Sequence, residues 1–275
     1  MARRGGIGGI GSVGSLRVIG VVGRGRSVSV RRRHAEGPQH EEGRVTPYYA
    51  DEWVTIYHGD CLDVLPLLRA DAVVSDPPYG VGVPYGPNYD DSRDDYWPWM
   101  RECVEAMRRS ASVVAFTHRV AAISELPGWD WVAVWNKGVT FGPRVGNSPL
   151  IAGWEPILMY GIHSVGVGGE GLADVQTLRP HKAGNIMDGA MGREKWRKQQ
   201  LGHPVPKPAS LYYRLVSTLS PEGGVVVDPF MGTGTTLRAA KDAGRRAIGI
   251  EVEEAYCELA VAGLAQETLD LGGVA

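Results

Sequence analysis

The sequence predicts an α/β domain with a doubly wound sheet. Between Trp53 and Leu264, seven short apolar runs alternate with segments whose apolar residues recur at helical spacing. Two of these runs end at an acidic residue that is followed by proline, at Asp76 and at Asp228. The chain has 275 residues, 43% of them hydrophobic, which suffices for one domain with a full core. In such a sheet, ligands bind at the carboxyl ends of the strands.

Each element follows from its local pattern. The expected strands are Trp53–Tyr57, Ala72–Ser75, Val113–Thr117, Trp131–Trp135, Ile157–Tyr160, Val225–Asp228 and Arg246–Ile250. The expected helices are 60–68, Tyr96–Arg109, Ala209–Leu219, Thr235–Ala243 and Glu253–Leu264. A loop rich in Gly, Pro, Asn and Asp runs from Gly80 to Asp95. Loops of this length are often functional lids, with Tyr85 and Tyr89 lining a pocket, and a plain surface loop fits equally well.

The cysteine pattern indicates the cellular compartment and argues against some classes of enzyme. Cys61, Cys103 and Cys257 are far apart and form no Cys-x-x-Cys pair. This pattern predicts no metal site, argues against the zinc deaminases, and fits a reducing, cytoplasmic compartment. Because no apolar run approaches the ~20 residues that a membrane span needs, we expect no membrane segment.

Charge is distributed unevenly along the chain. The first 44 residues hold nine Arg and three Glu, a net charge of +6, which leaves −8 on the remainder. Residues 1–45 are also rich in Gly and Ser, so we expect a disordered tail there and a folded domain over 46–275. A basic arm that gathers nucleic acid, a transit peptide and a misplaced upstream start are the other interpretations. Any nucleic-acid contact of the acidic body must come from a local basic patch.

The turn Asp76-Pro77-Pro78-Tyr79 is a candidate catalytic element. It is stiff, because neither proline can donate to a strand ladder and Pro77 keeps Asp76 out of the helical region. The exocyclic amine of a base is a poor nucleophile, since its lone pair is delocalised into the ring. Asp76 and the Pro77 carbonyl can each accept one N–H and localise that lone pair, while Tyr79 offers a face to a base that has left the duplex. Taken alone, the tetrapeptide is equally typical of a strand-ending turn.

A second stretch, Asp228–Thr236, predicts a strand, a glycine turn and the start of a helix. Its glycines let a ligand approach the backbone closely, beside the positive amino end of the helix. No Lys follows Gly234, so the stretch is not a phosphate-gripping loop. Glu251 ends the next strand, 19 residues past Gly232, where an acidic group commonly binds ribose hydroxyls.

Together the two stretches resemble the amino-methylating DNA methyltransferases that use S-adenosylmethionine. Asp76–Tyr79 is similar to their catalytic motif and Asp228–Thr236 to their cofactor motif. The catalytic motif comes first, as in the permuted beta group of that family. The resemblance covers most of the chain from Trp53 to Leu264. It implies a Rossmann-like, seven-stranded methyltransferase sheet, S-adenosylmethionine as cofactor and double-stranded DNA as substrate.

The resemblance also implies a role for each matching residue. The implied catalytic residues are Asp76, Pro77, Pro78 and Tyr79. The implied cofactor-binding residues are Asp60, Cys61, Lys207, Asp228, Pro229, Phe230, Gly232, Gly234, Thr235, Thr236 and Glu251. Asp60 is placed at the cofactor's adenine, although its spacing to Asp63 also suits a helix cap. Lys207 lies in a His-Pro-x-x-Lys-Pro element and is implied as the partner of the cofactor's carboxylate; a surface lysine is the plain alternative.

The segment 161–202 is expected to be a target-recognition insertion. Its basic residues Arg193, Lys195, Arg197 and Lys198 are interleaved with Trp and Gln, a combination that suits phosphates and base edges. A solvated helix face is nearly as consistent with this run.

The resemblance favours adenine N6 as the accepting atom. Family members with Asp at the position of Asp76 mostly methylate adenine, whereas the N4-cytosine enzymes mostly carry Ser. The alternatives are N4-cytosine methylation, methylation of RNA or of a protein amide, and a non-catalytic regulator that retains the cofactor and binds DNA. A homodimer and the nuclease partner of a restriction-modification system remain open.

Overall fold

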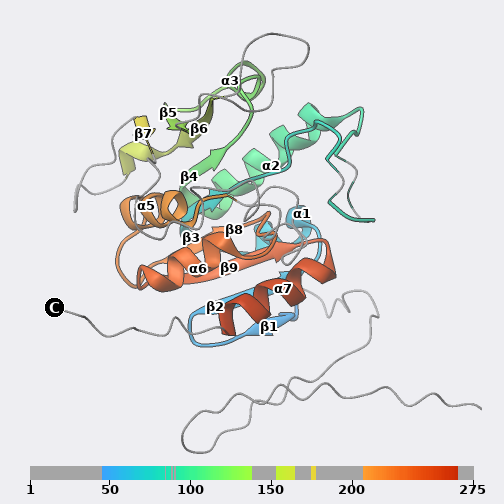
Figure 1. Ribbon diagram of the computed structural model, residues 1–275, viewed down its shortest axis with the longest axis vertical. Helices are drawn as coiled ribbons and strands as arrows, with labels where there is room; N and C mark the ends of the chain where they lie inside the picture. The colour runs from blue at the N-terminus through green and yellow to red at the C-terminus, as the bar shows by residue number, and fades with distance from the viewer. Residues whose placement is uncertain are drawn as a thin grey trace, which may run out of the picture. The chain divides into compact units, whose positions relative to one another are not determined.

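The computed structural model describes residues 45–83, 85–87, 89, 91–137, 153–164, 175–177 and 207–265. Within them, nine strands form one sheet in the order β1-β2-β9-β8-β3-β4-β6-β5-β7 (Figure 1). The strands are β1 (Tyr49–Ala50), β2 (Val54–His58), β3 (Ala70–Ser75), β4 (Ala111–Thr117), β5 (Trp131–Asn136), β6 (Trp154–Tyr160), β7 (Val175–Thr177), β8 (Val225–Asp228) and β9 (Arg246–Glu251). The predicted fold class and all seven predicted strands are confirmed, and the short strands β1 and β7 are additional.

Helices cover both faces of the sheet. They are α1 (Cys61–Val64), η1 (Leu65–Leu67), α2 (Tyr96–Ser110), α3 (Ala122–Glu125), η2 (Ile162–Ser164), α5 (Ala209–Leu219), α6 (Thr235–Asp242) and α7 (Glu254–Ala265). Residues of α5, α6 and α7 join one buried apolar cluster, and residues of α1, α2 and α3 join the other. Successive strand residues alternate between the two clusters: Val226 belongs to the first and Val227 to the second. None of the described helices is long and apolar enough to cross a membrane.

The order of the strands fixes where a ligand can bind. β8 pairs in parallel with β3 on one side and with β9 on the other. From β3 the chain runs through α2 to β4, and from β8 it runs through α6 to β9, so the two crossovers leave in opposite directions. The point between β3 and β8 is therefore the switch point at which open α/β sheets bind ligands. It brings Asp76, just after β3, to the same edge of the sheet as Asp228.

One helix is shorter than its sequence predicts. We expected a helix over 60–68, but α1 ends at Val64 and the chain continues as the 3-10 turn η1. Pro66 has no N–H to donate to the preceding turn, and this stops the α-helix. The sheet is also mixed, because β6 runs antiparallel to both β4 and β5.

Gly249 in β9 packs directly beneath the glycine loop. A Cβ atom added there would lie 2.8 Å from Leu237 Cδ1 and would also collide with the sulfur of Met231. We expect Gly249→Ala to lower the free energy of unfolding by about 1–3 kcal/mol, because the packed core cannot accept the methyl group. Urea denaturation measures this change. The matched control is Gly263→Ala on the exposed side of α7, where an added Cβ meets nothing within 4 Å and helix propensity raises stability by about 0.5–1 kcal/mol. Equal stability of wild type and Gly249→Ala would contradict this packing.

Candidate active site

A cavity of about 400 Å³ opens at the carboxyl ends of the central strands. Its walls come from the turns that follow β2, β3, β8 and β9, from the loop before α2, and from α2 and α7. The lining residues are Gly59, Asp60, Cys61, Asp76, Pro78, Tyr85, Tyr89, Arg93, Asp95, Trp99, Pro229, Phe230, Gly232, Glu251, Val252, Glu253 and Tyr256. The cavity lies at the switch point and has the size of a small-ligand site.

Asp60 does two things at once. Its Oδ1 accepts the Leu62 N–H at 2.8 Å, which caps α1, and the residue also lines the cavity. The adjacent Cys61 is buried, with its sulfur 4.0 Å from that of Cys103. The contact with Cys103 and burial hold the pKa of the Cys61 thiol well above its usual value, so Cys61 contributes a neutral wall.

Glu251 holds the glycine loop against the end of β9. Its two carboxylate oxygens accept the backbone N–H groups of Gly232 and Glu253, each at 2.9 Å. Gly232 has φ +51°, in the left-handed region that favours glycine. Burial raises the pKa of Glu251 to about 7, although both hydrogen bonds oppose the rise.

Four residues predicted to bind cofactor are not among the lining residues of the cavity. Asp228 is buried and accepts the Ser75 hydroxyl at 2.6 Å and the Phe230 N–H at 3.0 Å, so it ties the end of β3 to the glycine loop. Burial raises its pKa to about 6. The other three are at the start of α6 and do not line the cavity: Gly234, Thr235 and Thr236.

The catalytic turn presents one carboxylate to the cavity. Asp76 and Pro78 line it, whereas Pro77 is buried. Asp76 Oδ1 accepts the Thr117 hydroxyl at 2.6 Å and the Tyr79 hydroxyl at 3.0 Å. The Tyr212 hydroxyl lies 3.0 Å from Thr117 Oγ1, and it must donate there because the Thr117 proton points to Asp76.

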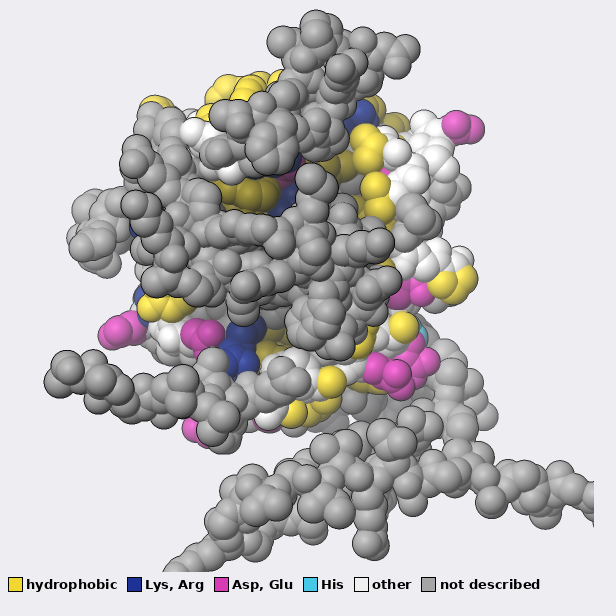
Figure 2. All heavy atoms as spheres, in the orientation of Figure 1, with side chains coloured by type: hydrophobic (Ala, Val, Ile, Leu, Met, Phe, Trp, Pro, Cys, Tyr) yellow, Lys and Arg dark blue, Asp and Glu magenta, His cyan; other side chains and the backbone are white. Residues whose placement is uncertain are grey.

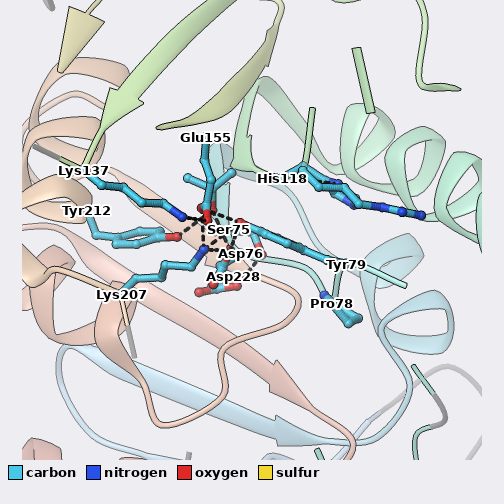
Figure 3. A network of polar contacts seen from close by, with 12 residues as sticks. Ser75, Asp76, Pro78, Tyr79, His118, Lys137, Glu155, Lys207, Tyr212 and Asp228 are labelled. Atoms are coloured by element: carbon cyan, nitrogen blue, oxygen red, sulfur yellow. Dashed lines mark hydrogen bonds and ion pairs between the residues drawn. The ribbon is translucent and has the colours of Figure 1, made fainter. Parts of the chain in front are cut away.

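Tyr79 is placed differently from the prediction. Its ring stacks on His118, with centroids 4.8 Å apart and planes 21° apart, and Lys207 Nζ lies 4.6 Å from the ring centroid. Its hydroxyl points into a group of charged side chains rather than into the cavity (Figure 3). In this conformation the ring is not a wall of the cavity, because His118 and the charged group hold it.

Lys207, which the resemblance implies as a partner of the cofactor's carboxylate, lies among acidic side chains. Its ammonium lies 2.7 Å from Glu155 Oε2, 3.2 Å from Asp76 Oδ1 and 2.6 Å from the Tyr79 hydroxyl. Glu155 Oε1 is in turn 2.6 Å from Lys137 Nζ. Figure 3 shows these side chains converging from separate segments of the chain. We call Asp76, Lys137, Glu155 and Lys207 the charged cluster.

Opposite charges stabilise the ionised forms within the charged cluster. Burial alone raises the pKa of Glu155, but Lys207 and Lys137 outweigh it and hold the pKa below its usual value. Burial alone lowers the pKa of Lys207, but Asp76 and Glu155 outweigh it and raise the pKa. Both groups therefore remain charged near neutral pH.

Four side chains at this site carry no sequence motif that predicts a site role: Thr117, Lys137, Glu155 and Tyr212. One available signal was Glu155-Pro156 at the start of the otherwise apolar strand β6, because a carboxylate that enters a core needs a charged partner. The identity of that partner was not readable, because the prediction had placed Lys207 at the cofactor.

A buried histidine fixes the far side of the turn. His118 is fully buried, and its Nδ1 accepts the Arg119 N–H at 2.8 Å. The proton must then sit on Nε2, which donates to the Tyr96 hydroxyl at 2.6 Å; that hydroxyl donates to the Pro78 carbonyl at 2.5 Å. Burial and the neighbouring Arg119 lower the pKa of His118 to about 3, so it stays neutral.

Asp91 organises the loop that forms the cavity's outer wall. It is buried and accepts three backbone N–H groups at 2.9 Å, those of Gly80, Val81 and Val83. The same loop places Tyr85, Tyr89 and Arg93 on the cavity. The expectation that the two tyrosines line a pocket agrees with this arrangement.

The predicted DNA contacts Arg193, Lys195, Arg197 and Lys198 lie outside the described residues, as does most of the expected insertion 161–202. On the face shown in Figure 2, acidic side chains gather along the lower edge of the described surface, and no continuous band of Lys and Arg is visible there. No group of three or more His, Cys, Asp or Glu that could hold a metal ion occurs in the part of the chain that the structure describes.

Comparisons with known proteins agree with this geometry. The family model described as DNA methylase, which covers N6 and N4 methyltransferases, matches residues 132–262. The chain is 27% identical over 269 residues to the type II methyltransferase M.ScaI of Streptomyces caespitosus, a match that spans 82% of this chain and 86% of the relative. These matches support a DNA amino-methyltransferase. The cofactor of this family is S-adenosylmethionine.

Other relatives of this DNA amino-methyltransferase span most of its length. The DNA adenine methyltransferase YhdJ of Escherichia coli strain K12 is 25% identical over 248 residues, covering 77% of this chain and 82% of the relative. Among solved structures, the cytosine-N4-specific PvuII DNA methyltransferase has a TM-score of 0.59 at 15% identity, covering 81% of this chain and 90% of its own. The M1.HpyAVI–SAM complex has a TM-score of 0.53 at 23% identity, covering 77% and 100%. These structures share the fold.

The loop held by Asp91 should control affinity for the cofactor. Asparagine keeps one acceptor oxygen at position 91 but turns the other into a donor that faces N–H groups, which costs about 1–3 kcal/mol per lost hydrogen bond. We expect Asp91→Asn to weaken S-adenosylmethionine binding by at least about tenfold, since about 1.4 kcal/mol is tenfold in affinity. Calorimetry measures this change. Asp94→Asn, at an exposed position of the same loop, is the matched control. Unchanged affinity in Asp91→Asn would show that the loop does not shape the site.

The raised pKa of Glu251 makes stability depend on pH. The folded state binds this proton more tightly than the unfolded chain does. The contribution of Glu251 is therefore complete below pH 4.5, its ordinary pKa, and is lost as pH rises through about 7. At about 1.4 kcal/mol per pKa unit, the loss is roughly 3 kcal/mol. Glu251→Gln should reduce the fall in unfolding free energy between about pH 5 and about pH 8, as measured by urea denaturation. The exposed control Glu222→Gln should retain the full fall, and a Glu251→Gln profile identical to wild type would exclude this assignment.

Proposed function

We propose that this protein transfers a methyl group from S-adenosylmethionine to the exocyclic N6 of adenine in double-stranded DNA, acting on a base that has left the duplex. The observation that carries the proposal is the position of Asp76. Asp76 lines the cavity, at the switch point of a DNA amino-methyltransferase fold.

The cavity suits the cofactor in size and in charge. A volume of about 400 Å³ lies in the range of small-ligand sites. The cavity is lined by five acidic residues: Asp60, Asp76, Asp95, Glu251 and Glu253. Arg93 is the single Lys or Arg among the described lining residues. This excess of acid favours a ligand that carries a positive sulfonium and a positive ammonium. Phe230 and Trp99, whose rings meet edge to face at 5.8 Å, offer an apolar wall to its adenine.

The protein's own contribution is alignment and a better nucleophile. When bound, S-adenosylmethionine supplies a methyl group whose bond to sulfur breaks as the N–CH₃ bond forms, with the electron pair left on sulfur and one proton lost from the amine. Asp76 and the Pro77 carbonyl each accept one N–H of that amine, which localises the nitrogen lone pair toward the methyl group. Because the methyl group is already activated, orientation supplies most of the acceleration.

Adenine is favoured over cytosine by the carboxylate. The first residue of the catalytic turn is Asp76, and members of the family with Asp there mostly methylate adenine. YhdJ, a relative across most of this chain, is named a DNA adenine methyltransferase. For the DNA contacts, we propose the basic run that contains Arg193, Lys195, Arg197 and Lys198, within a target-recognition segment over 161–202.

The test measures transfer and identifies the product. Purified protein is incubated with DNA and methyl-labelled S-adenosylmethionine, and the DNA is digested to nucleosides for mass spectrometry. We expect N6-methyladenine from wild type. Asp76→Ala should bind the cofactor normally by calorimetry but lose transfer, because the amine then lacks one acceptor. The exposed Asp63→Ala is the matched control and should transfer normally.

Three outcomes contradict parts of this proposal. N4-methylcytosine without N6-methyladenine overturns the base and leaves the reaction class in place. Label on RNA or protein but not on DNA overturns the substrate. Near-normal turnover in Asp76→Ala removes the catalytic role from Asp76.

A further inference from the structure

The charged cluster has equal numbers of positive and negative groups, but these groups differ in how deeply they are buried. It contains two carboxylates and two ammoniums, and their side chains are 22% exposed for Asp76, 14% for Glu155, 22% for Lys137 and 6% for Lys207. Lys207 is the most deeply buried of the four. Its ammonium lies closer to Glu155, at 2.7 Å, than to Asp76, at 3.2 Å. Both carboxylates therefore compensate the buried ammonium, and the shorter contact is the one with Glu155.

The two oxygens of Asp76 are used differently. Oδ1 has three neighbours that can donate to it: the Thr117 hydroxyl at 2.6 Å, the Tyr79 hydroxyl at 3.0 Å and Lys207 Nζ at 3.2 Å. Oδ2 accepts no hydrogen bond from the residues that the structure describes. Since the residue lines the cavity, Oδ2 is the oxygen left for a ligand.

Glu155 is the group that limits how closely Lys207 approaches Asp76. Its Oε2 accepts an N–H of Lys207 and lies 2.8 Å from the Tyr79 hydroxyl, while its Oε1 is ion-paired with Lys137. If the charge of Glu155 were removed, Asp76 would be the remaining carboxylate beside the buried ammonium of Lys207 among the described residues. An uncompensated ammonium in so buried a place is costly, so Lys207 would move further onto Asp76 and compete for Oδ2.

Resting on the function proposed above, we propose that Glu155 is a positioning residue for methyl transfer. It holds Lys207 away from Oδ2 of Asp76, which therefore stays free to accept an N–H of the target amine. Glu155 itself touches neither the cavity nor the amine and acts only through Lys207 and Tyr79.

Glu155→Gln tests this role because it removes the charge and keeps the shape. The single-turnover rate at saturating cofactor and DNA should fall by roughly 100-fold, the cost of misplacing a reacting group by about an ångström. The dissociation constant and KM for S-adenosylmethionine should stay within about twofold of wild type, because Glu155 does not line the cavity. Glu105→Gln, at an exposed position, is the surface control and should keep the wild-type rate.

A second substitution separates positioning from support of the fold. Under this proposal, Glu155→Gln combined with Lys207→Met frees Oδ2 again and recovers the rate by about tenfold over Glu155→Gln alone. A purely structural role predicts that the double variant is as slow as Glu155→Gln, or slower. Lys137→Met removes an ammonium but leaves Lys207 on Glu155, so its loss should be less than about tenfold.

The outcomes decide the inference in every case. Glu155→Gln with a near-wild-type rate, a double variant that is no faster than Glu155→Gln, or Lys137→Met as slow as Glu155→Gln would each overturn it. If Glu155→Gln does not fold, the double variant decides, because neutral replacement of a buried ion pair is often tolerated. A folded, cofactor-binding double variant within about tenfold of wild type supports the inference, and an inactive one contradicts it. A wild-type protein that transfers no methyl group to DNA would instead refute the proposed function.

Discussion

The buried charge of Lys207 is the constraint on which the geometry of the site depends. Its side chain is 6% exposed, so two carboxylates must lie within reach of it. One is Asp76, just after β3, and the other is Glu155, in β6. Because β4 separates these two strands in the sheet, the partners reach each other only above its carboxyl edge. The charge of Lys207 thus links the turn that begins at Asp76 to β6. The sequence of β6 contains neither of the two motifs.

The same edge of the sheet joins the catalytic turn to the cofactor cavity. Ser75, the last residue of β3, donates to Asp228, the last residue of β8, at 2.6 Å. Asp76 follows the first strand end and the glycine loop follows the second. A shift in either turn therefore moves the other, so the turn that begins at Asp76 and the glycine loop stay in register. This coupling explains why Asp228 serves the site although it does not line the cavity.

The sequence predicted the parts of this site that local chemistry dictates. Proline after Asp76 and after Asp228 marked the two strand ends, and the short apolar runs located all seven principal strands. Of the cavity residues, Glu251 followed from its spacing to Gly232, whereas Asp60 and Phe230 followed from the resemblance of short motifs to a known family. In each of these cases the signal lies within about 20 residues of the chain.

Long-range pairings were not predictable in this way. The partner of Lys207 is 52 residues away in the sequence, and the pair forms only because β6 lies antiparallel beside β4. Tyr79 was expected to face a base, but its hydroxyl is held by charged side chains from other segments of the chain. The sequence of the tetrapeptide alone does not predict these contacts. The early end of α1, by contrast, is predictable from Pro66, although the spacing of the apolar residues continues to Leu68.

The most direct test of this account is a crystal structure of the protein with an unreactive cofactor analogue and a DNA oligonucleotide that contains its methylation site. We expect the target amine within hydrogen-bonding distance of Asp76 Oδ2 and the Pro77 carbonyl, while Lys207 remains on Glu155 Oε2. An amine held by other groups, or Lys207 withdrawn from Glu155 to the carboxylate of the cofactor, would contradict the account.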